Sequence, residues 1–382
     1  MMPMSCARAV ALLLAGACAI AHAGEPTAAV AHPIGSDADL DHYLAHVASG
    51  ESPLDRLSPP AKRRFLAAFR EGRPSTADLA AELTRDEARA VLALFGLEAF
   101  VPARMRAAHL AIGASETPDA SARFDAIEKA AFAPEARAAV SAEYRRAFAP
   151  SQTRSTLRRF SDGDVALWFR AAQHRVEVDP DADLHDLTLD LAELERRGVA
   201  APAWIAGTYQ MFLVRRDIAD ARTFRANHPD AGLPAPPQIR DESNGKGPTV
   251  LAQRDDGTLV RRTVTLDPHA QVVVIAGCHF SKDAAEAIET DPVLRPLFSR
   301  NTAWITPAGE NPADPDLARW NRDHPLAALR TAYRESEWPA IDTWNMPTFY
   351  FLRDSRVVAK VVGWQGRRDA VLAGYRALGL AP

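Results

Sequence analysis

The sequence predicts two kinds of structure in one chain, an all-helical N-terminal region followed by an α/β sandwich domain. Apolar residues recur at helical spacing from about residue 38 to about 230. A Pro-rich polar stretch, 231–248, then interrupts the pattern, and short β-branched runs alternate with helical ones after it. We therefore expect a helical region at 24–230, a linker at 231–248 and a second domain at 249–382.

The composition is that of a globular protein and excludes one class of partner. Of the 382 residues, 47% are hydrophobic and 25% are charged. Lys and Arg total 45 against 49 Asp and Glu, which gives a formal net charge of −4. Because no basic surplus is available to hold a phosphate backbone, we expect no nucleic acid partner.

Residues 1–23 have the features of a secretory signal peptide. Arg8 precedes the apolar run 9–20, and Ala21-His22-Ala23 supplies a cleavage site before Gly24. The run is too short to span a bilayer of about 30 Å as a helix, and no later run is longer. We expect an exported, periplasmic protein that starts at Gly24 and has no stable membrane insertion. A lipoprotein processed at Cys18 is the alternative.

Export leaves a single cysteine in the mature protein. Cys6 and Cys18 are removed with the signal peptide, so Cys278 remains alone and no internal disulfide can form. In an oxidising compartment, a lone cysteine is either buried and inert or a thiol kept for chemistry.

Helix start signals divide the N-terminal region. Ser58 before Pro59-Pro60 is typical of an N-cap followed by first-turn prolines, and Thr84 with Glu87 forms a capping box. Four further helices are expected at about 162–178, 183–198, 202–215 and 217–228. Their short connections predict antiparallel hairpins. The last pair is similar to a tetratricopeptide-type unit through Trp204, Tyr209, Ala219, Ala221, Phe224 and Pro229, which favours a protein partner for this region.

The second domain is predicted as an α/β sandwich around one mixed sheet. Its expected elements, in order, are a β-hairpin at 249–266, a buried strand at 271–276, a helix at about 282–297, a strand at 302–305, a second hairpin at 348–364 and a helix at about 367–378. The stretch 306–340 is expected to be irregular and helical. It is either a lid or substrate-facing insert, or a surface excursion that packs its own Trp320 and Trp338.

Two motifs occupy defined places on these elements. Gly277-Cys278-His279-Phe280-Ser281-Lys282 follows the buried strand and opens a helix, and Met346-Pro347-Thr348 precedes the last hairpin. Together and in this order they resemble the C-x-x-C loop and the cis-proline segment of the thioredoxin superfamily. The resemblance covers the C-terminal domain only, and it implies a thioredoxin-like fold. The hairpin at 249–266 resembles the additional strands of exported thiol:disulfide interchange proteins.

The motif positions favour thiol chemistry. A cysteine at a helix N-terminus lies among unpaired N–H groups at the positive end of the dipole, which favours the thiolate nucleophile, and a protonated His279 adds to this effect. The resemblance implies that Met346, Pro347 and Thr348 shape the groove in which a substrate peptide is held as an added strand.

Ser281 departs from the family pattern, because it occupies the position of the resolving cysteine. We therefore expect monothiol exchange, in which Cys278 attacks a substrate disulfide or a glutathione adduct and an external thiol resolves the product. Ser281 can hydrogen-bond the thiolate. The expected partners are protein or peptide thiols and disulfides, and glutathione. The alternative is a non-catalytic scaffold that binds peptides or proteins through the same domain and the helical hairpins.

No cofactor or metal is expected. His42 and His46 are spaced as a metal pair, but no third ligand accompanies them. Asp179, Asp181, Asp183 and Asp186 lack the glycine and terminal glutamate of a calcium loop, so they are interpreted as a turn and a helix N-cap.

Overall fold

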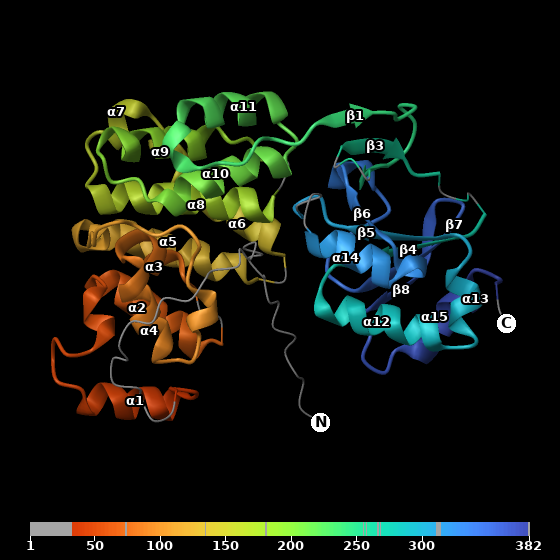
Figure 1. Cartoon of the computed structure of the whole chain (residues 1–382), viewed down its shortest axis with the longest axis horizontal. Coiled ribbons are helices and arrows are strands. Elements are labelled where there is room, and N and C mark those ends of the chain that lie inside the picture. Colours follow the sequence, from red (N-terminus) through yellow and green to blue (C-terminus); the bar gives the residue numbers. More distant parts are fainter. Residues whose placement is uncertain are drawn as a thin grey trace. The chain divides into compact units, whose positions relative to one another are not determined.

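The computed structural model describes residues 33–72, 75–133, 135–179, 182–254, 256, 258–265, 267, 269–310 and 315–380. The described residues form 15 α-helices and a mixed eight-stranded sheet, so the predicted mixed α and β class is confirmed (Figure 1). None of these helices is long and apolar enough to cross a membrane. The predicted signal peptide at 1–23 lies outside the described residues and stays a prediction.

The chain divides into two compact units. The helical unit holds the residues up to Met211 together with His228–Leu233, and the sheet unit holds Phe212–Asn227 and the residues from Pro234 onward. The helices of the first unit are α1 (Asp37–His46), α2 (Pro59–Arg70), α3 (Ala77–Glu82), α4 (Arg85–Ala93), α5 (Pro118–Ala131), α6 (Ala136–Ala147), α7 (Arg154–Leu157), α8 (Asp162–Val178), α9 (His185–Arg196) and most of α10 (Pro202–Val214).

Two predicted helix starts are confirmed by their caps. The Ser58 hydroxyl accepts the N–H of Ala61 at the start of α2, and Thr84 and Glu87 form the expected capping box of α4. The helices α8, α9, α10 and α11 (Ile218–Asn227) match the four predicted spans to within two residues. These agreements follow from local signals, since a cap needs only residues that are neighbours in sequence.

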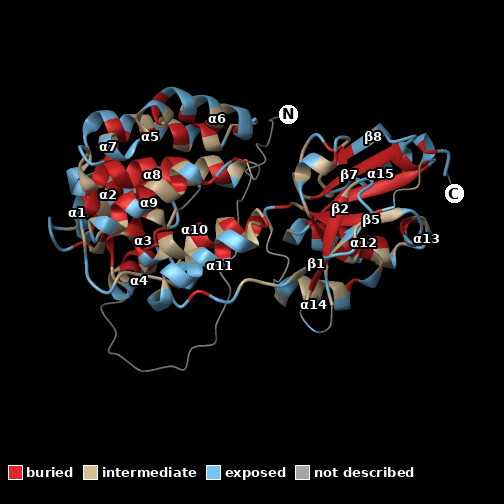
Figure 2. Cartoon of the chain, turned by 90° about the horizontal axis from the view of Figure 1, so that it is seen from above, coloured by how far each residue is buried: buried red, intermediate tan, exposed pale blue. Residues whose placement is uncertain are grey.

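Helix α8 forms the centre of the helical unit. All residues from Gly163 to Ala172 are buried, and α8 packs against α5, α6 and α9 (Figure 2). A helix that is enclosed on all sides must be approached closely by its neighbours. At Gly163 an added Cβ would lie 2.7 Å from the backbone N of Glu116 and 2.8 Å from the carbonyl O of Ile112, so only glycine fits there.

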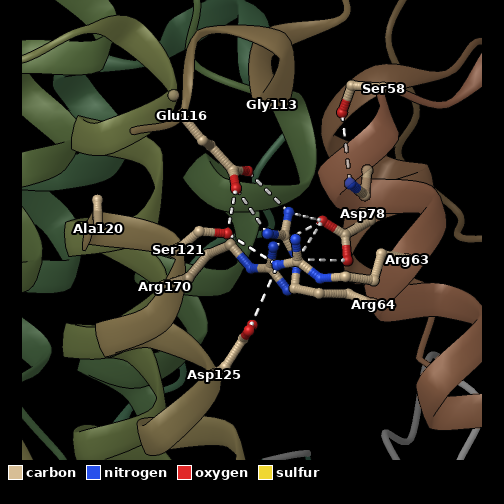
Figure 3. Close-up of polar contacts among 12 residues, drawn as sticks. Ser58, Arg63, Arg64, Asp78, Gly113, Glu116, Ala120, Ser121, Asp125 and Arg170 are labelled. Carbon is tan, nitrogen blue, oxygen red and sulfur yellow. Dashed lines mark hydrogen bonds and ion pairs between the residues drawn. The ribbon is translucent and has the colours of Figure 1, made fainter. Parts of the chain in front are cut away.

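A buried ion-pair network crosses the helical unit. Arg64 of α2 pairs with Asp78 of α3 at 2.7 Å and with Glu116 at 2.7 Å, and Arg170 of α8 also pairs with Asp78 at 2.7 Å (Figure 3). The side chains of Arg64, Asp78 and Arg170 are at most 6% exposed. Burial raises the pKa of Asp78, but the guanidinium groups of Arg170 and Arg64 outweigh burial and lower that pKa below its ordinary value. The network therefore joins three helices through charges that compensate one another.

The sheet unit contains all eight strands. They are β1 (Ile239–Asp241), β2 (Thr249–Gln253), β3 (Leu259–Thr263), β4 (Gln271–Ile275), β5 (Thr302–Thr306), β6 (Leu329–Ala332), β7 (Thr348–Arg353) and β8 (Arg356–Val362), in the order β1-β3-β2-β6-β5-β4-β7-β8. Both predicted hairpins are present, because β2 pairs with β3 and β7 pairs with β8 in antiparallel fashion. Strand β4 lies between the parallel β5 and the antiparallel β7.

The two faces of the sheet are covered differently. Val272 and Val274 of β4 pack in one cluster with residues of α12 (His279–Thr290), α13 (Leu294–Phe298) and α15 (Arg368–Ala377). Val273 and Ile275 face the other way, into a cluster that includes Trp338. Successive residues of a strand point to opposite faces, which explains why this run is apolar throughout.

Three expectations for this unit need correction. The helix predicted at 282–297 is two helices, since α12 ends at Thr290, and the Asp291 carboxylate before Pro292 accepts the N–H groups of Val293 and Leu294 to open α13. The stretch 306–340 holds α14 (Pro315–Asp323) and contributes β6, which pairs with β5 and β2, so it is an integral part of the sheet rather than an added lid or excursion. The predicted linker contains β1, which pairs with β3.

Candidate functional site

Cys278 lies at the junction of the central strand and the helix that follows it. Strand β4 ends at Ile275, and α12 begins at His279, so Cys278 is the N-cap residue. It is half-buried and not part of a disulfide. The helix starts three residues earlier than the sequence predicted, which brings Cys278 itself to the helix N-terminus, where backbone N–H groups have no intrahelical acceptor.

Ser281 lies next to the thiol, as predicted. Its Oγ is 3.4 Å from Cys278 Sγ, and its side chain is fully buried. The same Oγ accepts the backbone N–H of Gly277 at 3.2 Å. Because this bond uses an acceptor position of the hydroxyl, the hydroxyl hydrogen is free to be donated to the sulfur.

The segment before β7 reaches the same point from the other side. Cys278 Sγ lies 3.5 Å from the carbonyl O of Met346, and the Met346–Pro347 peptide bond is cis. Gly277 has a φ of +150°, and an added Cβ there would lie 3.1 Å from the Met346 sulfur. The backbone conformation favours glycine at this position, and the approach of the Met346 side chain leaves little room for a Cβ.

Two predicted site residues do not contact the sulfur. His279 is exposed, and its ring packs on Phe280 with 3.7 Å between ring centroids. Thr348 is fully buried, and its hydroxyl donates to the carbonyl O of Asn345 at 2.7 Å. The hydroxyl of Thr348 therefore fixes the turn before β7 and is not directed to a substrate, and Pro347, which is also buried, lies within this turn between Met346 and Thr348.

The two polar atoms recorded beside the thiol, Ser281 Oγ and the Met346 carbonyl O, are uncharged. Phe280, which is 41% exposed, follows on the first turn of α12. The nearest cation along the helix, Lys282, is paired with Glu286 at 3.7 Å. The arrangement offers an accessible nucleophile, one hydroxyl donor and a backbone carbonyl beside it.

The other candidate clusters are arranged as structural pairs. The described residues contain no group of three or more His, Cys, Asp or Glu side chains that could hold a metal ion. His46 Nδ1 bonds to the carbonyl O of His42 at 2.7 Å. Asp183 accepts the N–H of His185 at the start of α9, but the N-cap of that helix is Leu184 and has no side-chain cap, so the N-cap part of the interpretation is wrong for Asp183; Asp181 lies outside the described residues.

The comparisons with protein-family models, with curated proteins and with solved structures found no match to this chain. The argument for a function therefore rests on the geometry around Cys278.

Sequence reasoning missed the buried charges of the helical unit. Asp78 and Glu82 lie in a six-residue helix of otherwise apolar side chains, and both are buried. Charged residues at apolar positions of a helix are the one signal that could have indicated such a network. The partners of Asp78 are Arg64 and Arg170, which are 14 and 92 positions away from it in sequence. The pairing itself is therefore a property of the tertiary fold.

Proposed function

We propose that the chain is an exported thioredoxin-like protein that performs monothiol thiol:disulfide exchange at Cys278. The observation that carries this proposal is the position of the sulfur, half-exposed at the start of α12, 3.4 Å from Ser281 Oγ and 3.5 Å from the Met346 carbonyl. The central strand that leads into the thiol, the cis bond at Met346–Pro347 and the preceding hairpin all support the family resemblance.

The exchange proceeds in two balanced steps. The Cys278 thiolate attacks one sulfur of a substrate disulfide, the disulfide bond breaks, and the second sulfur leaves as a thiolate that takes up a proton from water. A second thiolate, from glutathione or from another cysteine of the substrate, then attacks the substrate sulfur of the mixed disulfide; a new disulfide forms between these two sulfurs, the bond to Cys278 breaks, and Cys278 leaves as a thiolate. Ser281 has no sulfur, so resolution comes from outside the site. The Ser281 hydroxyl stabilises the Cys278 thiolate by hydrogen bonding, both before it attacks and when it leaves.

The Met346 segment supports a protein or peptide as the substrate. An extended peptide that pairs with the backbone beside Met346 would bring its disulfide to Cys278. Protein or peptide disulfides are therefore proposed as the substrates, and glutathione or a second cysteine of the substrate as the resolving thiol.

The proposal is tested with three proteins and one disulfide-bonded peptide in a glutathione buffer. The natural protein is expected to catalyse slow, glutathione-dependent exchange, which Cys278→Ala abolishes. Ser281→Cys is expected to form an internal disulfide and to reduce insulin without depending on glutathione for resolution. Exchange by Cys278→Ala at the natural rate would refute the role of the thiol. Failure of Ser281→Cys to form an internal disulfide under oxidising conditions would show that the loop is not built as a redox turn.

A non-catalytic scaffold is the second candidate, and the exposed Phe280 beside the site favours it. An exposed aromatic side chain is a common anchor for a bound peptide. If this candidate is correct, Cys278→Ala binds an unfolded, disulfide-free peptide as tightly as the natural protein does, Phe280→Ala binds it more weakly, and neither protein catalyses exchange.

A further inference from the structure

Asp190 lies in the interior of the helical unit with half of its carboxyl group unpaired. Its side chain is on α9 and fully buried. Oδ2 accepts a hydrogen bond from Gln152 Nε2 at 3.0 Å. Oδ1 is buried and has no partner among the described residues, and the same is true of Gln152 Oε1. Asp190 and Gln152 are thus hydrogen-bonded to each other, and each also has one buried oxygen that accepts no hydrogen bond from the described residues.

The groups that are hydrogen-bonded to this pair have already used their own hydrogens. Gln152 Nε2 uses its second hydrogen on the Tyr144 hydroxyl at 2.8 Å, and Tyr144 donates its own hydrogen to Asp186 Oδ2 at 2.9 Å. Arg175 is directed to Asp186 and Asp183, at 3.5 Å and 3.1 Å. No cation of the described residues forms an ion pair with Asp190.

We propose that Asp190 is held as a neutral carboxylic acid that donates its hydrogen from Oδ1 to Gln152 Oε1. The acid and the amide then form two hydrogen bonds in opposite directions, one of which is the observed bond from Nε2 to Oδ2. A single proton satisfies both orphan acceptors, which otherwise would be two unmet hydrogen-bonding groups in the same small volume.

The electrostatic environment agrees with this assignment. Burial raises the pKa of Asp190 well above its ordinary range, the bond from Gln152 opposes this, and the negative charge of Asp186 adds to it. The titratable and charged groups around the cluster are Tyr144 of α6, Arg175 of α8, Asp186 of α9 and the exposed Arg154 of α7. Of these, Asp186 is the one whose charge acts on Asp190, and it disfavours ionisation.

The pair makes the helical unit sensitive to pH. Gln152 belongs to the connection between α6 and α7, and Asp190 belongs to α9. The hydrogen bond that the Asp190 proton makes to Gln152 therefore holds this connection against α9. A carboxyl group with a raised pKa stabilises the folded state fully below its unfolded pKa of about 3.9, and this contribution falls as pH rises toward the folded pKa. Above that value, a carboxylate faces the amide oxygen and the connection is released.

The test compares Asp190→Asn with Asp190→Ala in the full chain. The Asn amide supplies a hydrogen in place of the acid proton and does not titrate. We expect Asp190→Asn to keep the natural hydrogen-exchange protection of peptides covering 144–196 at acidic pH and to lose the decline that the natural protein shows as pH rises above about 4. Asp190→Ala is expected to lose that protection at every pH.

The matched control is Asp164→Asn. Asp164 is a buried aspartate of α8 whose Oδ1 accepts the N–H of Thr117 at 2.7 Å, a bond that an amide oxygen can also accept. This variant is expected to retain the decline that the natural protein shows with rising pH.

Two results would overturn the proposal. One is that Asp190→Asn is as poorly protected as Asp190→Ala. The other is that NMR of the natural protein, with selectively labelled aspartate carboxyl carbons, shows no neutral acid at pH 7. The NMR measurement needs no variant, so it decides the matter even if both substitutions prevent folding. A water molecule that satisfies an ionised Asp190 would also give this negative NMR result.

Discussion

Replacing Asp78 with alanine leaves a buried cation without its main ion-pair partner, because two guanidinium groups pair with this one carboxylate. Asp78 accepts hydrogen bonds from Arg64 Nε and Nη2, at 3.3 Å and 2.7 Å, and from Arg170 Nη1 at 2.7 Å (Figure 3). In Asp78→Ala, Arg64 keeps Glu116 at 2.7 Å. Arg170 keeps only Glu128 at 3.4 Å and the Phe124 ring, 4.4 Å from its guanidinium carbon. The loss therefore falls mainly on Arg170.

The size of the effect follows from this asymmetry. Removing one partner of a buried ion pair costs about 3–5 kcal/mol, and the surviving Arg64–Glu116 pair places this case near the lower end, at about 3–4 kcal/mol. That is a large fraction of a typical domain stability of about 5–15 kcal/mol. For a unit of this size it corresponds to a fall in Tm of about 6–16 °C, at about 2–4 °C per kcal/mol.

The assay is urea unfolding of the full chain. A second measurement, the hydrogen exchange of peptides from α2, α3 and α8, locates the loss of stability. Asp125→Ala is the matched control, since its pair with Arg63 is 3.3 Å long and both side chains are about half exposed. That control is expected to change stability by less than about 1 kcal/mol. Adding Arg170→Met to Asp78→Ala removes the stranded charge and is expected to recover stability. A cost below about 1 kcal/mol for Asp78→Ala, with no recovery in the double variant, would refute the reasoning.

Three further predictions concern packing, acid stability and domain independence. Gly374→Ala is expected to cost about 1–3 kcal/mol in chemical denaturation, because an added Cβ would lie 2.4 Å from the Phe351 ring; a cost near zero would show that the ring moves aside. Hydrogen bonding from Arg196, assisted by Arg197, lowers the pKa of Glu193 to about 2, so its stabilisation is present above about pH 4.5 and is lost as pH falls toward 2. Glu193→Gln should flatten this part of the acid unfolding profile, and an unchanged profile would contradict the assignment. A fragment of residues 212–382 is expected to melt cooperatively in calorimetry, since it contains the whole sheet unit with all eight strands, and a molten aggregate would disprove its independence.

The parts of the fold that sequence reasoning predicted depend on neighbouring residues. The capping box at Thr84 and the β-branched run of β4 each carry their signal within a few positions. Strand β6 carries no such signal, because four residues that include the exposed Arg330 are typical of many loops. Its identity as a strand comes from pairing with β2 and β5, which lie far from it in the chain, and β propensity is dominated by such context.

The buried polar groups of the helical unit were beyond sequence reasoning for a related reason. Asp78 and Asp190 occupy positions that an apolar stripe would fill, which marks them as unusual but does not indicate which residues they meet. Whether such a residue is ionised or neutral depends on what the fold places beside it. Asp78 lies between two guanidinium groups, which lower its pKa, whereas Asp190 lies beside an amide and another carboxyl group, and its pKa is raised.

The candidate site depends on sheet register, which links its two motifs. Cys278 and Met346 are 68 positions apart, yet Sγ and the carbonyl O lie 3.5 Å from each other. The pairing of Ile275 with Thr348 in the antiparallel ladder of β4 and β7 fixes both motifs at the same end of the sheet. A slip of one residue would turn every side chain of β7 to the opposite face, and the buried clusters on both faces of the sheet prevent this slip. The same apolar packing that stabilises the sheet unit therefore sets the distance between the thiol and the peptide segment beside it. If Cys278 performs the exchange proposed above, core substitutions in β7 should alter its rate without touching the site.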